Sequence, residues 1–116
     1  MPTYRVNDAG VRHARRLIAA GRYDDSTEWS EAAPSTEERN AEIEEEGREE
    51  WSRWYLAVDE DAGETTKARY RFPYGDFENV NRAALVQAKQ RAGQNDHPQI
   101  EQAADELLQR LDAQRS

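Results

Sequence analysis

The sequence WSRWYLAV at residues 51–58 carries two of the three tryptophans of the chain. Its side chains at positions i, i+3, i+4 and i+7 would share one face of a helix: Trp51, Trp54, Tyr55 and Val58. Such a stripe is typical of a helix that forms a hydrophobic core, because each aromatic side chain buries about 150–250 Å². The alternative is an exposed groove for a partner. We expect the core, because large aliphatic residues are scarce in this chain.

Further helices are predicted on both sides of this stretch, over about 8–20, 35–46, 80–92 and from residue 98 onward. Ser35 and Glu38 have the spacing of a capping box at the start of the second of these helices. The short connection before the last helix predicts a helical hairpin. That last helix has the clearest apolar face, formed by Ile100, Ala104, Leu107, Leu108 and Leu111.

The segment 67–72 alternates between basic and apolar residues and ends at Pro73, which predicts a short strand. A last helical turn from Thr65 is the alternative for the same residues. If it is a strand, it would pair with Tyr4–Val6, which also alternates. Residues 22–35 are polar and have no periodicity, so we expect an acidic, mobile loop there.

These elements predict one mainly α domain over residues 1–116, because this length suits a single domain. We expect four to five helices and at most a short two-stranded β element, formed by Tyr4–Val6 and Ala68–Phe72. The core is predicted to draw on eleven residues: Leu17, Ile18, Trp51, Trp54, Tyr55, Tyr70, Phe72, Leu85, Leu107, Leu108 and Leu111.

The net charge of −8 is unevenly distributed. Residues 1–23 carry a net charge of +4, residues 24–64 carry −13 and residues 65–116 carry +1. We expect the basic N-terminal helix to pair with the acidic middle within the molecule. An acidic chain repels phosphate backbones, which disfavours general nucleic-acid binding.

The sequence offers little for catalysis or metal binding. It has no cysteine and two histidines, His13 and His97, which excludes thiolate chemistry and a histidine-rich metal site. No glycine-rich phosphate loop or nucleophile elbow is present. The acidic string at 59–64 does not match a calcium loop, because the glycine falls at the fifth position and Tyr70 occupies the twelfth. We therefore expect no catalytic residue, no metal and no cofactor.

The best candidate for a recognition surface is the segment 67–74, which interleaves basic and aromatic side chains. Such interleaving can hold single-stranded nucleic acid by stacking and phosphate contacts. The same pattern also fits an edge strand whose charged residues protect it from aggregation, and we favour that interpretation. On the next helix, Lys89 and Arg91 could extend a basic patch. The candidate partner-binding residues are Lys67, Arg69, Tyr70, Arg71, Tyr74 and Arg82.

The sequence TKARYRFPYG at residues 66–75, together with Val80, Arg82, Ala84-Leu85, Ala88 and Arg91-Ala92, resembles a small uncharacterised domain. This domain occurs in bacterial hypothetical proteins and in tailed-phage or prophage-associated proteins. The tail AADELLQRLD at 103–112 and the Trp51 to Leu56 region fit the same pattern. The resemblance implies an assembly or interaction module and assigns no catalytic residue.

Three classes of function follow from these observations. We expect a non-enzymatic protein-interaction or assembly module, with a protein as its partner. A nucleic-acid-binding module that uses the segment 67–74 is the first alternative, and a small enzyme or cation-binding protein that uses the acidic middle is the second. No apolar run approaches the roughly 20 residues of a membrane span and no signal-peptide core is present, so we expect a cytoplasmic protein without membrane contact.

Overall fold

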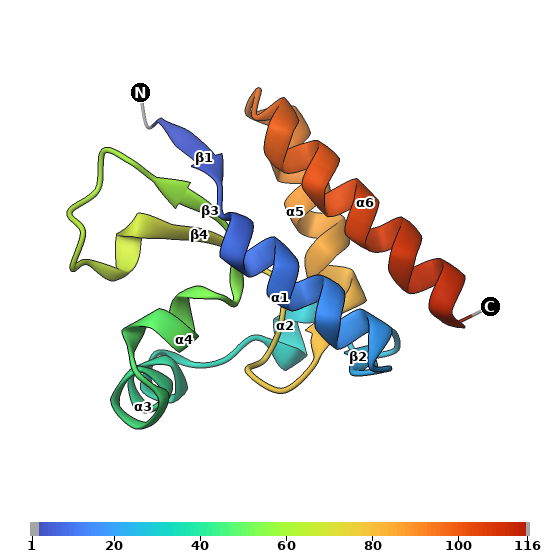
Figure 1. Cartoon of the computed structure of the whole chain (residues 1–116), viewed down its shortest axis with the longest axis horizontal. Coiled ribbons are helices and arrows are strands. Elements are labelled where there is room, and N and C mark those ends of the chain that lie inside the picture. The colour runs from blue at the N-terminus through green and yellow to red at the C-terminus, as the bar shows by residue number, and fades with distance from the viewer. Residues whose placement is uncertain (1–2, 116) are drawn as a thin grey trace.

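The structure is a computed structural model that describes residues 3–115. It is a mixed α/β fold in which helices make up 58% of the described residues and strands 15% (Figure 1). A 3₁₀ turn at Lys67–Arg69 precedes the fourth strand. In chain order the other elements are β1 (Tyr4–Val6), α1 (Asp8–Ala19), β2 (Tyr23–Asp24), α2 (Trp29–Ala32), α3 (Thr36–Glu46), α4 (Arg48–Ser52), β3 (Tyr55–Asp59), β4 (Tyr70–Pro73), β5 (Val80–Asn81), α5 (Arg82–Gln94) and α6 (Pro98–Arg115).

The strands form two small sheets, so the prediction of a mainly α domain with at most a two-stranded β element is wrong. One sheet is antiparallel with the order β1-β3-β4, and the other is the parallel pair β2-β5. The predicted pairing of Tyr4–Val6 with Ala68–Phe72 is also wrong, because β3 lies between these two segments. Val58 of β3 pairs with Arg5 on one side and with Tyr70 on the other.

The error arises at residues 51–58, which we predicted as one helix. Helix α4 ends at Ser52, and Tyr55–Asp59 is the central strand of the antiparallel sheet. All five residues of β3 are buried, so the strand lacks the alternation of a half-buried strand. A continuous apolar run matches the apolar positions of a helix as well as those of a buried strand. The predicted burial is confirmed: Trp51 is 1% exposed, Trp54 6% and Tyr55 5%.

Helix α1 packs tightly against the start of β3. A Cβ atom on Gly10 would lie 2.0 Å from the carbonyl oxygen of Tyr55. The side chain of Asn7, just before the helix, donates from Nδ2 to the carbonyl oxygens of Ser52 at 2.9 Å and Tyr55 at 3.0 Å. The side chain of Asn7 thus makes no capping hydrogen bond to α1 but ties the β1–α1 junction to the entry of β3.

Helices α5 and α6 form the predicted hairpin and lie side by side (Figure 1). Asn81 caps α5, since its Oδ1 accepts from the amide of Ala84 at 2.9 Å, and Gly93 lies inside the helix rather than ending it. The apolar face of α6 is buried as predicted. Nine of the predicted core residues are buried, whereas Tyr70 and Phe72 are partly exposed and pack against the core.

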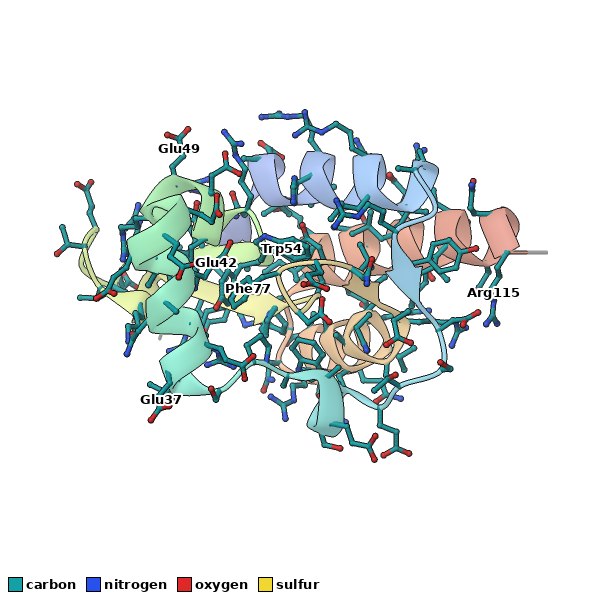
Figure 2. All side chains as sticks on the ribbon, turned by 90° about the horizontal axis from the view of Figure 1, so that it is seen from below. Glu37, Glu42, Glu49, Trp54, Phe77 and Arg115 are labelled. Atoms are coloured by element: carbon teal, nitrogen blue, oxygen red, sulfur yellow. The ribbon has the colours of Figure 1, made fainter. Side chains whose placement is uncertain are left out.

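The acidic middle is more structured than predicted. The segment 22–35 contains β2 and the short helix α2. The capping box of Ser35 and Glu38 is confirmed at the start of α3, and Gly47 separates α3 from α4 with a φ of 91°, a left-handed conformation that favours glycine. Figure 2 shows Glu37 and Glu49 directed outward on these helices, with Trp54 among the packed elements.

The two glycines inside helices offer a matched test of the α1–β3 contact. Gly10→Ala should lower the free energy of unfolding by more than about 2 kcal/mol, because the new methyl group meets a backbone carbonyl that cannot move aside. Gly93→Ala should raise it by up to about 1 kcal/mol, because alanine favours the helix and the added Cβ meets only the flexible Glu101 carboxylate. Urea unfolding measures both values, and a stable Gly10→Ala protein would contradict the described packing.

Candidate functional site

A groove of about 620 Å³ opens between β4 and α5. We call it the β4–α5 groove. Three elements bring arginines to it: Arg39 comes from α3, Arg71 from β4 and Arg91 from α5. These residues are far apart in the sequence, so the groove exists only in the folded chain.

The charge of the groove differs from that of the whole protein. No aspartate or glutamate is among the residues that line it. Within residues 3–115, the guanidinium groups of Arg39, Arg71 and Arg91 make no ion pair and no hydrogen bond. In a protein of net charge −8, the groove is therefore a locally cationic region with free hydrogen-bond donors.

Aromatic rings line much of the groove. Tyr4 stacks on His97 with ring centroids 4.5 Å apart, and it meets Phe72 edge-on at 6.0 Å. Phe72 has a φ of 62°, so the backbone of β4 is locally left-handed where it reaches these rings. The ring of Tyr70 also contacts the ring of Trp51 edge-on, with the ring centroids 5.5 Å apart. Trp29 of α2 also contributes to the lining.

One face of α5 lies beside the groove. The helix faces it with Ala84, Gln87, Ala88, Arg91 and, just past its end, Asn95. This spacing is one face of a helix, with alanines at the bottom and amide or guanidinium groups at the rim. Opposite the alanines lies Tyr55; burial raises the pKa of its hydroxyl, and the charge of Arg39 acts in the opposite direction.

Of the six residues predicted to bind a partner, Tyr70 and Arg71 line this groove. Lys67 donates to Oδ1 of Asn40, and Arg69 donates to the carbonyl oxygen of Ala62 at 3.1 Å. The structure thus does not bring the whole segment 67–74 to one surface.

The other two candidates, Tyr74 and Arg82, interact with other parts of the chain. Tyr74 is 0% exposed, and its hydroxyl donates to the carbonyl oxygen of Arg53 at 2.7 Å. Arg82 forms an ion pair with Asp112 at 2.8 Å. Lys89, which was expected to extend the patch, pairs with Asp105 at 2.9 Å, so this face of α5 is turned to α6 and only Arg91 faces the groove.

Sequence reasoning missed Tyr4, Trp29, Arg39 and the amides of α5 as members of one site. Only the α5 face carried a usable signal, since small, amide and basic residues repeat there at helical spacing. The predicted pairing of the basic N-terminal helix with the acidic middle was also wrong for α1. Within residues 3–115, the ion pair of α1 joins Arg15 to Glu106 of α6.

The histidines lie in different settings. His97 is in the groove, stacked on Tyr4. His13 meets the Trp54 ring edge-on at 5.0 Å, and its Nε2 atom is buried without a hydrogen-bond partner. Over residues 3–115, no three histidine, aspartate or glutamate side chains are grouped as a metal ion requires.

Comparisons with known proteins give no indication of the function of this chain. No protein-family model, no curated protein and no solved structure matches the chain. The resemblance to the phage-associated domain therefore stays a prediction. None of the helices in residues 3–115 combines the length and apolar character needed to cross a membrane.

The setting of His13 predicts a pH-dependent stability. Burial lowers the pKa of His13, and the nearby charge of Arg16 adds to this effect. The unfolded chain takes up a proton at the ordinary histidine pKa of about 6.5, whereas the folded chain does so only at lower pH. Below about pH 6.5 the free energy of unfolding should therefore fall, and the fall should be smaller in His13→Gln. Urea unfolding of both proteins at about pH 7.5 and 5.5 measures the difference. Equal losses in the two proteins would contradict it.

Proposed function

We propose that the protein is a non-enzymatic interaction module that binds a negatively charged segment of a partner protein in the β4–α5 groove. The observation that supports this proposal is the lining itself. Arg39, Arg71 and Arg91, whose guanidinium groups make no ion pair or hydrogen bond within the described residues 3–115, face a groove that lacks carboxylates in an otherwise acidic protein. We place this binding in the cytoplasm, as the sequence predicts.

The chemistry of the lining supports binding rather than catalysis. Apart from the arginines, its titratable groups are His97 and tyrosines, and no serine, threonine or lysine is among the lining residues. Guanidinium groups pair with carboxylates in a bidentate manner. The amide of Gln87 at the rim can bond the backbone of an extended peptide, since it offers both a donor and an acceptor. The amide nitrogen of Asn95 already donates to the carbonyl oxygen of Arg91 at 2.9 Å, and its oxygen can still accept from a peptide.

A peptide fits the surroundings of the groove better than a long polyphosphate does. Arg39 lies on α3, which also carries six glutamates and no other basic residue. A nucleic-acid strand would bring one charge per nucleotide past this acidic helix. A protein segment can place a few carboxylates on the arginines and leave its other positions neutral.

Single-stranded nucleic acid is the second candidate. It is favoured by the aromatic rings beside the arginines, among them Tyr70 and Phe72 next to Arg71. Bases stack on such rings with little regard for sequence. Direct competition between the two ligand classes separates the candidates.

The test measures the affinity of the full chain for a fluorescent acidic peptide, in which four glutamates alternate with glycine and serine. Arg71→Glu and Arg91→Glu should each weaken binding by about tenfold or more, because each replaces an attraction in the groove by a repulsion. Arg12→Glu and Arg16→Glu on α1 are matched controls, because they change the net charge equally and lie outside the groove. Both arginines are exposed and make no ion pair within residues 3–115. These controls should stay within about twofold of the wild type.

Two results would contradict the proposal. Equal losses in the groove variants and the α1 variants would show that only net charge matters. Tighter binding of an oligothymidine of matched charge than of the acidic peptide, with the same loss in Arg71→Glu, would favour the nucleic-acid candidate instead.

A further inference from the structure

We infer that pH controls the binding of the acidic segment through His97, so that protonation of this side chain strengthens binding in the β4–α5 groove. The inference rests on the proposed function. His97 lines the groove together with Arg71 and Arg91, and it lies in the turn that joins α5 to α6. Histidine is the side chain that ordinarily changes its charge between about pH 5 and 8. A proton on His97 adds a further positive charge to the groove.

Contacts inside the protein hold the imidazole ring of His97 at the groove. The ring stacks on Tyr4 with centroids 4.5 Å apart, and it meets the ring of Phe72 edge-on at 6.3 Å. The backbone amide of His97 donates to the carbonyl oxygen of Ala92 at 2.8 Å. Within residues 3–115 the ring nitrogens make no hydrogen bond, and neither of them is buried. Both are therefore open to a ligand, and a protonated ring donates from both.

The charged and titratable groups around His97 leave it without an anionic partner in the groove. They are Arg71, Arg91 and Tyr4 on the groove side and, outside the groove, Asp59 beside Tyr4 in the sheet, Asp96 before His97 and Glu101 at the start of α6. None of the three carboxylates lines the groove, and within residues 3–115 none pairs with His97. A carboxylate of the ligand would supply the partner that a protonated His97 lacks.

Protonation and ligand binding are coupled for this reason. A carboxylate is attracted by a protonated imidazole and not by a neutral one, so the ligand has unequal affinity for the two forms of the groove. The arginines of the groove stay charged and the glutamates of the ligand stay largely ionised down to about pH 5.5. The affinity for an acidic segment should therefore rise as the pH falls from about 8 to 5.5.

The first experiment measures the affinity of the full chain for the same acidic peptide at about pH 8 and about pH 5.5, at constant ionic strength. The wild type should bind about threefold or more tightly at the lower pH, because one charge pair is gained. His97→Gln and His97→Phe should reduce this ratio to within about 1.5-fold. The phenylalanine preserves a ring beside Tyr4 but does not titrate. His13→Gln is the matched control and should keep the full ratio, because His13 is the other histidine of the chain and lies outside the groove.

The outcomes separate the inference from the proposed function. Equal affinity of the wild type at both pH values would overturn the control by pH and leave the acidic ligand standing. The inference would also be overturned if the pH dependence survived in folded His97 variants, or if His13→Gln abolished it. No binding at either pH would overturn the proposed function itself, and the inference with it. Circular dichroism at both pH values shows which variants are folded.

A second experiment observes the histidines directly and needs no His97 variant. A ligand that binds better to the protonated form must, by reciprocity, also favour protonation of His97. Proton NMR follows the rings of both histidines during a pH titration, and His13→Gln identifies which signal belongs to His97. Saturating acidic peptide should move the midpoint of this titration to higher pH by about half a pH unit, which corresponds to the threefold change in affinity. An unchanged midpoint with the peptide bound would overturn the inference.

Discussion

The burial of β3 along its whole length is the constraint on which the rest of the structure depends. A strand with no face open to water must be covered on both sides, and the polar groups around it need partners inside the protein. Helix α1 reaches the strand closely because Gly10 has no side chain there. Asn7 satisfies the carbonyl groups of Ser52 and Tyr55 at the point where the chain enters the strand. The interior thus combines apolar packing with a few specific polar contacts.

The same arrangement accounts for the groove. Because β3 is central, β4 lies at the edge of the sheet, where Tyr70 and Arg71 line the groove together with residues of α5. The side of α5 that carries Arg82 and Lys89 is turned to α6, where these residues pair with Asp112 and Asp105. On the face beside the groove, the alanines Ala84 and Ala88 are almost fully buried, whereas Gln87, Arg91 and Asn95 are exposed.

The sequence predicted correctly those elements that depend on interactions between residues close together in the chain. The capping box at Ser35 and the apolar face of α6 each depend on residues a few positions apart. The stretch 51–58 was misassigned because an uninterrupted apolar run fits two structures, and only its partners β1 and β4 decide between them. The site was beyond sequence reasoning for a similar reason. Its arginines come from α3, β4 and α5, and nothing local relates them.

The weak anchoring of α3 has a consequence for the groove. None of its residues is fully buried, and Ile43 is its one side chain that packs partly against the core. Segments with few buried contacts open in small excursions while the remainder of a protein stays folded, so the amide hydrogens of α3 should exchange with solvent faster than those of α6. When α3 opens locally, Arg39 moves with it. One wall of the groove is therefore adjustable, whereas the walls formed by β4 and α5 are fixed by the core.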